Sequence, residues 1–188
     1  MPPKAKISKQ DVIKTALSLA QSGGESAINA RDVAGALGCS TQPIFSNFAT
    51  MDDLVKDVKV QAYGLYSEYI SREVKSGKYP EYKAFGMAYI RFAEQEKNLF
   101  KMLFMCDRRG QDLSPTADFD ASVDLISRAI GVDKKTAEQI HFELWAFVHG
   151  IATMFATHFL TLGWDDVSEM LTDVYKGVVA RHVGGNGK

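Results

Sequence analysis

The chain has 188 residues, of which 46% are hydrophobic and 24% charged, and its formal net charge is −1. This is an ordinary globular composition, too close to neutral for a protein that coats nucleic acid with its whole surface. No apolar run reaches the ~18–20 residues of a membrane span, and the N-terminus lacks a signal-peptide core, so we expect a cytoplasmic protein without membrane contact. Cys39 and Cys106 lie in unrelated contexts without metal-binding spacing and predict reduced thiols.

The charge is unevenly divided along the chain. Residues 1–48 carry a formal +2, and the remaining 140 residues carry −3. A basic N-terminal region suits local contact with phosphate, although this excess is small. The length fits one domain, or a small head on a larger body.

Every element that the sequence predicts is helical, because apolar residues recur at helical spacing and no period-2 run is long enough for a strand. The first helix is expected to start after Ser8, which can form a capping box with Asp11. Its buried stripe is expected to include Val12, Ile13, Ala16, Leu17 and Ala20. Gly23-Gly24 is expected to end it.

Two short helices and a tight turn follow. Asn29 can cap a second helix of about nine residues, and Gly38 lies where a left-handed C-terminal residue is needed. Ser40 and Thr41 can then start a third short helix that ends near Phe48. Two such helices with a glycine-containing turn are typical of the helix-turn-helix, whose second helix enters the DNA major groove. A plain helical hairpin in a bundle has the same spacing, so the spacing alone leaves both interpretations open.

The rest of the chain is expected to hold six further helices. Thr50 and Asp53 can form a second capping box ahead of the first of them, and Asn98 is expected to cap a short apolar one. Gly163 is expected to close a long helix that Asp133 caps. The predicted helices span about 51–76, 81–95, 99–105, 116–130, 134–162 and 165–182, with a polar loop over 106–115.

In combination, these elements resemble the TetR family of transcriptional regulators. The residues that carry the resemblance are the first helix with its Gly-Gly end, Arg31 to Gly38, Thr41 to Phe48, and Asp52-Asp53-Leu54. The stretch Trp145 to Gly150 also resembles a Trp-x-x-x-His-Gly segment of one branch of TetR C-terminal domains. The resemblance implies an all-α chain of about nine helices, with a three-helix DNA-binding head (residues 1–50) and a ligand-binding and dimerisation body (residues 51–188).

The resemblance further implies a homodimeric repressor that binds a palindromic operator in double-stranded DNA and is released by a small, largely hydrophobic effector. No enzyme, cofactor or metal is expected, because no nucleophile is paired with a base. His141 and His149 lie two turns apart with no third ligand spaced near them. The alternative is a helical ligand-binding or interaction protein with degenerate DNA binding.

The candidate DNA-contacting residues lie mainly in the third helix. Gln42 and Asn47 have amides that can bind the N6/N7 edge of adenine, and the Thr41 methyl group can contact thymine. Equally, these residues can be ordinary surface side chains at the end of a helix, and Lys9 and Arg31 either contact phosphate or are solvated charges. The full set is Lys9, Arg31, Ser40, Thr41, Gln42, Pro43, Phe45, Ser46 and Asn47, whereas Ile44 and Phe48 are expected to face the core.

Three positions depart from the pattern usual in TetR relatives, which often have tyrosine at Phe45, histidine at Asn47 and lysine at Met51. The missing hydroxyl and ammonium groups remove two usual phosphate contacts. DNA affinity is therefore expected to depend more on backbone amides, Lys9 and Arg31.

The body is rich in aromatic side chains, which are either core residues or the walls of a ligand cavity; their polar tips suit a cavity. The candidate effector-binding residues are Tyr66, Tyr89, Phe92, Phe104, Trp145 and His149. The long helix 134–162 also has a face of small residues, which lets a partner helix approach closely. In TetR relatives the last two long helices form the dimer interface, so the candidate dimer face is Ala146, Gly150, Thr153 and Thr157.

Overall fold

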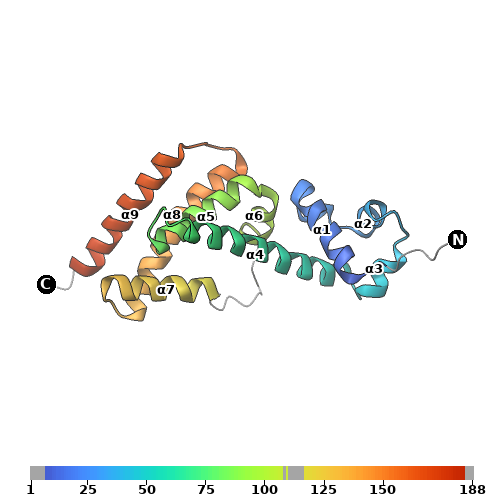
Figure 1. Cartoon of the computed structure of the whole chain (residues 1–188), viewed down its shortest axis with the longest axis horizontal. Helices are drawn as coiled ribbons and strands as arrows, with labels where there is room; N and C mark the ends of the chain where they lie inside the picture. The colour runs from blue at the N-terminus through green and yellow to red at the C-terminus, as the bar shows by residue number, and fades with distance from the viewer. Residues whose placement is uncertain (1–6, 108, 110–116, 185–188) are drawn as a thin grey trace. The chain divides into compact units, whose positions relative to one another are not determined.

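The structure, a computed structural model, describes residues 7–107, 109 and 117–184. Within these ranges the chain forms nine α-helices, one short 3₁₀-helix and no strand, which confirms the all-α prediction (Figure 1). None of these described helices is long and apolar enough to cross a membrane. Most of the predicted loop 106–115 lies outside the described residues.

The chain divides into two compact units. Unit 1 comprises the chain up to Ser67 together with Glu96–Cys106, and unit 2 comprises Glu68–Gln95 and the chain from Asp107 onward. This division follows from packing alone and does not identify the residues that bind DNA. The division into a DNA-binding head (1–50) and a body (51–188) therefore stays a prediction.

Unit 1 packs around its first helix. Its elements are α1 (Lys9–Gly23), the 3₁₀-helix η1 (Glu25–Ala27), α2 (Ala30–Ala36), α3 (Gln42–Asn47), the first part of α4 (Met51–Lys75) and α6 (Lys97–Phe104). The first helix, α1, contacts η1, α2, α3 and α6 directly. α1 buries Val12, Ile13, Ala16 and Ala20 at helical spacing, as predicted, and Leu17 is partly buried. Both predicted capping boxes form, Ser8 with Asp11 and Thr50 with Asp53.

Unit 2 is organised around α8, which packs against three neighbouring helices (Figure 1). Its elements are the last part of α4, α5 (Glu81–Gln95), α7 (Ala117–Ile130), α8 (Lys134–Thr157) and α9 (Trp164–Gly184). One apolar cluster joins α7 to α8, with side chains of α9 against it; its fully buried members are Val123, Ile126, Ala137 and Ile140.

Three predicted helix ends were wrong. α8 stops at Thr157 rather than near Leu162, because His158 adopts a left-handed conformation with φ of 56° and its N–H bonds back to α8. Gly163 does not close α8; its carbonyl accepts the first hydrogen bond of α9, from the Val167 N–H. Asn98 does not cap α6, which begins at Lys97 after Glu96.

Two tyrosine–histidine hydrogen bonds join α5 to α8. The Tyr82 Oη lies 3.0 Å from His141 Nδ1, and the Tyr89 Oη lies 2.9 Å from His149 Nδ1. Burial raises the pKa of Tyr82, so its phenol keeps the proton, and the imidazole tautomer decides which of the two groups donates. Burial also lowers the pKa of His141 to about 4 and that of His149 below its usual value.

This burial of His141 predicts a pH-dependent stability. The unfolded chain binds the His141 proton near pH 6.5, whereas the folded chain binds it only near pH 4. The stabilising contribution is therefore complete above pH 6.5 and is lost as the pH falls toward 4. In urea unfolding, the free energy of unfolding of His141→Gln, whose amide can still hydrogen-bond to Tyr82, should fall by about 1–2 kcal/mol less than that of the wild type between pH 7.5 and pH 5.

The control for this experiment is His158→Asn, at an exposed histidine whose left-handed backbone asparagine tolerates. It should keep the pH dependence of the wild type. Identical pH dependence in His141→Gln and the wild type would contradict the prediction.

Candidate functional site

The turn between α2 and α3 has the geometry that the sequence predicts. The Asn29 side chain accepts from the Asp32 N–H at 3.0 Å and caps α2. Gly38 is left-handed with φ of 63°, its N–H bonds to the Gly35 carbonyl, and the Cys39 N–H bonds to the Ala34 carbonyl. These two bonds form a Schellman motif, which ends α2 and starts a tight turn. α2 is shorter than predicted, at seven residues.

α3 buries one side and exposes the other. Ile44 is fully buried and Phe48, directly after the helix, is 4% exposed, so both face the core as expected. Pro43 lies in the first turn, where its missing N–H leaves no bond unmade. The outward side carries Ser40, Thr41, Gln42, Phe45 and Ser46, all exposed. Thr41 is the N-cap residue of α3, as expected, although its side chain makes no capping hydrogen bond.

The polar side chains of α3 differ in whether they are hydrogen-bonded within the helix. The Ser46 hydroxyl donates to the Gln42 carbonyl at 2.9 Å, and the Asn47 amide donates to the Pro43 carbonyl at 2.7 Å. The Gln42 side chain is exposed and makes no hydrogen bond with the described residues. Of the two candidate adenine-binding amides, Gln42 is therefore the one available to a ligand without breaking an internal bond.

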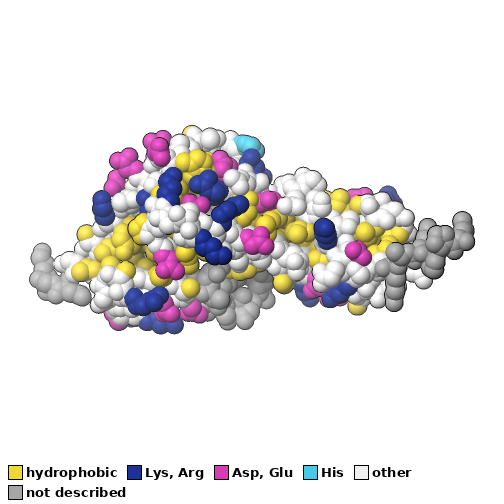
Figure 2. Space-filling view, in the orientation of Figure 1, with side chains coloured by type: hydrophobic (Ala, Val, Ile, Leu, Met, Phe, Trp, Pro, Cys, Tyr) yellow, Lys and Arg dark blue, Asp and Glu magenta, His cyan; other side chains and the backbone are white. Residues whose placement is uncertain are grey.

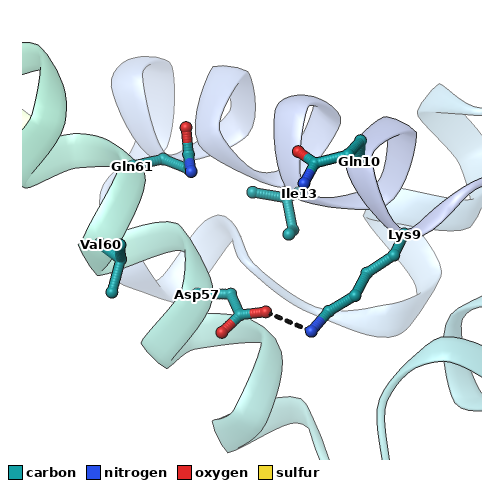
Figure 3. A pocket seen from close by; sticks show the side chains of 6 residues that line it. All are labelled: Lys9, Gln10, Ile13, Asp57, Val60 and Gln61. Carbon is teal, nitrogen blue, oxygen red and sulfur yellow. Dashed lines mark ion pairs between the residues drawn. The ribbon is translucent and has the colours of Figure 1, made fainter.

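Lys9 lies beside a shallow depression between α1 and α4. The depression has a volume of about 210 Å³ and is lined by Lys9, Gln10 and Ile13 of α1 and by Asp57, Val60 and Gln61 of α4 (Figure 3). The Lys9 Nζ is 2.7 Å from an Asp57 carboxylate oxygen and 5.0 Å from the centre of the Phe48 ring. Both charged side chains are partly exposed, and such a pair contributes only about 0–1 kcal/mol. A phosphate can therefore replace Asp57 as the partner of Lys9.

The other candidate cation of the head is isolated. Arg31 is exposed in the first turn of α2. On the face shown in Figure 2, the Lys and Arg side chains over α1–α3 are separate and interspersed with acidic and apolar ones. On this face the basic side chains therefore form no continuous patch over α1–α3.

The six candidate effector-binding residues fall into two groups. In unit 1, the rings of Tyr66 and Phe104 meet edge to face at 5.3 Å. In unit 2, Trp145 stacks on His149 with 5.0 Å between ring centres, and His149 pairs with Tyr89. Phe92, also in unit 2, is fully buried and packs against Tyr69.

The unit 2 group reaches the surface. Tyr89 is 5% exposed, whereas Trp145 is 40% exposed. The Tyr89–His149–Trp145 series therefore runs from the core of unit 2 to its outside along α8.

Sequence reasoning missed a charged pair in unit 2, between the partly buried Arg91 and the buried Glu73. Arg91 of α5 has its guanidinium 4.1 Å from the centre of the Trp164 ring, and its Nε is 3.3 Å from a carboxylate oxygen of the buried Glu73. The available signal was an arginine between Ile90 and Phe92 in an otherwise apolar run. The tyrosine–histidine pairing was also missed, although the seven-residue spacing of the tyrosines nearly matches the eight-residue spacing of the histidines.

The predicted small-residue face of α8 is open. A Cβ added at Gly150 would meet nothing within 4 Å. Ala146 and Thr157 are exposed, and Phe142, one turn before Ala146 on the same face, is 62% exposed. An open stripe of small residues that starts with an exposed phenylalanine suits contact with another helix.

A family model for the tetracyclin repressor-like C-terminal domain matches residues 82–177, just over half of the chain. The matched residues begin in α5 and end in α9, so they include both tyrosine–histidine pairs and the open face of α8. The chain belongs to the TetR family. No curated protein matches it. As a TetR-family regulator, it has the all-α fold that the N-terminal motifs and the Trp145 to Gly150 segment indicated.

The ion pair of Lys9 yields a prediction about DNA affinity in this TetR-family protein. Asp57→Asn should tighten binding to any duplex about 3–10-fold at low salt and steepen the salt dependence by about one counterion, because it frees the Lys9 ammonium for phosphate. Filter binding or fluorescence anisotropy over a salt series measures both quantities.

The Lys9→Ala background provides the control. Lys9→Ala should weaken binding to all DNA alike. Adding Asp57→Asn to Lys9→Ala should raise DNA affinity only slightly, because it removes only the repulsion between the Asp57 carboxylate and the phosphates. An equal gain in both backgrounds would mean that Lys9 does not contact phosphate.

Proposed function

We propose that this TetR-family protein is a DNA-binding transcriptional repressor whose recognition helix is α3. The observation that carries the proposal is the two-sided burial of α3, which turns Gln42, Phe45 and Ser46 outward while Ile44 anchors the helix. A helix held in this way after a tight glycine turn fits the major groove. As a homodimer, the protein would read two half-sites about 34–36 Å apart.

Base reading is assigned mainly to Gln42. Its amide can bind adenine through two hydrogen bonds, and its side chain is not engaged within the described chain. Phe45 occupies the position where relatives often have tyrosine, and at 52% exposure it offers an apolar surface to thymine methyl groups or to sugar. Ser40, Thr41, Ser46, Asn47 and Arg31 would position the helix on the backbone.

Gln42→Ala should weaken binding to the preferred operator by about 1–3 kcal/mol and change binding to random DNA little. The preferred site would come from selection in a random duplex pool, and affinities from anisotropy at fixed salt. Gln61→Ala, at an exposed glutamine of α4, is the matched control and should behave like the wild type. Equal losses on both DNAs in Gln42→Ala would remove Gln42 from base recognition.

We further propose that the homodimer forms through α8 and α9. The supporting features are the open stripe from Phe142 through Gly150 to Thr157 and the exposed Met170 on α9. Small residues let two helix backbones approach closely, and the exposed aromatic ring gives apolar area to bury.

Gly150→Leu should shift the protein from dimer to monomer in light scattering. The change has room within one chain and improves helix propensity, so the folded subunit should persist while the added side chain separates the packed helices. Gly64→Leu in α4, another open helical glycine, is the matched control and should remain dimeric. A dimeric, DNA-competent Gly150→Leu protein would place the interface elsewhere.

The effector is proposed to be a small, largely hydrophobic or aromatic compound. Of the candidate effector-binding residues, the unit 2 group of Tyr89, Phe92, Trp145 and His149 supports this proposal, because its area is mostly apolar with few polar tips. Linkage requires that a compound released by operator binding also weakens operator binding by the same factor. A compound that saturates the body, quenches Trp145 and leaves operator affinity unchanged would contradict this mechanism.

A helical ligand-binding or interaction protein with degenerate DNA binding is the second candidate. The observation that favours it is the internal pairing of two expected DNA contacts, Lys9 with Asp57 and Asn47 with Pro43. Salt-dependent binding of duplex DNA separates the two candidates, because the second predicts none at physiological ionic strength.

A further inference from the structure

The C-terminal end of α1 is held by a side chain from a distant part of the chain. The Asn98 Nδ2 of α6 donates to the Gln21 carbonyl at 2.9 Å and to the Ser22 carbonyl at 3.0 Å. The last carbonyls of an α-helix have no partner within the helix. Asn98 therefore supplies from α6 what a C-cap usually supplies locally.

The local chain does not provide these two bonds. After Ser22 the chain continues into η1, where the Gly24 N–H bonds to the Ala20 carbonyl, one turn earlier. Gly24 has φ of 76°, and a Cβ at Gly23 would lie 2.8 Å from the Ala27 Cβ, so this junction is tightly constrained. Asn98 thus bonds to a rigid helix end rather than to a loose one.

α1 connects this junction to the candidate DNA-binding surface. The helix has 15 residues, a length of about 22 Å at 1.5 Å per residue. Its first residue, Lys9, lies against Phe48 at the end of α3, and its last turn carries the two carbonyls that Asn98 bonds. α2 and α3 both pack on α1, so this one helix is in contact both with the candidate recognition helix and with the Asn98 side chain.

A second contact ties the same two helices together. The Gln21 Nε2 donates to a Glu96 carboxylate oxygen at 3.1 Å, directly before α6 begins. This bond joins two exposed side chains, whereas Asn98 bonds to backbone. Asn98 makes two hydrogen bonds to carbonyls that the helix holds in place, whereas the Gln21–Glu96 bond joins two side chains, so Asn98 is the stronger constraint.

We propose that Asn98 is a positioning residue that couples α6 to the DNA-binding head by capping α1. This inference rests on the proposed DNA binding by α3. It predicts that operator binding stabilises the helical structure of α6, and that this effect depends on the side-chain amide of Asn98. The prediction can be tested without knowing the effector.

Hydrogen exchange of the full-length protein tests this coupling, with operator duplex from the random pool as the only ligand. In the wild type, the operator should slow exchange of the α6 amides, Leu99 to Phe104, by about tenfold, in addition to protecting α1–α3. In Asn98→Ala and in the isosteric Asn98→Asp, which has no donor, protection of α1–α3 should remain and that of α6 should disappear.

Two controls separate coupling from simple stabilisation. Gln21→Ala keeps the backbone carbonyl that Asn98 bonds, and Lys101→Ala changes an exposed side chain of α6; both should keep the α6 protection of the wild type. A purely structural role of Asn98 would speed exchange at the end of α1 without DNA and leave the operator-induced protection of α6 unchanged.

The wild-type measurement keeps the inference testable even if both Asn98 variants fold poorly. An operator that binds tightly without slowing exchange in α6 would overturn the coupling and leave the proposed DNA binding intact. Failure to select any duplex from the random pool would instead contradict the proposed function itself.

Discussion

The first three helices of unit 1 depend on how the ends of α2 and α3 are satisfied. α2 and α3 have seven and six residues, well below the ~12–15 residues at which isolated helices become stable in water. Their hydrogen bonds therefore persist only because Asn29 caps one end of α2, the Gly38 turn closes the other, and Ile44 of α3 is fully buried. Burying an isoleucine side chain contributes about 1.5–3 kcal/mol, comparable to what the two caps contribute together.

Unit 2 is held by a different kind of interaction. Long helices make their own backbone hydrogen bonds, so contacts between side chains must fix how one helix is positioned along its neighbour. The two tyrosine–histidine bonds fix α5 against α8 at two places about two turns apart. The same α8 keeps its small-residue face uncovered, so the buried side sets the register while the open side is available to a partner.

The sequence predicts those features that arise within a few residues. The capping boxes at Ser8 and Thr50, the cap at Asn29 and the left-handed Gly38 were all foreseen, because each depends on neighbours three or four positions away. Asn98 was misassigned because its partners are 76 and 77 positions distant. The pairing of Lys9 with Asp57 was missed for the same reason, and His158 ends α8 although histidine carries no strong stop signal.

Both tryptophans of the chain lie in unit 2, and each stacks on a group that can influence its excited state. Trp145 lies on the imidazole of His149, and Trp164 lies on the guanidinium of Arg91 and beside Phe155. Unit 1 contains tyrosines but no tryptophan. Intrinsic tryptophan emission is thus a selective optical reporter of unit 2, and a spectral change on adding DNA would report a change outside the unit that contains α3.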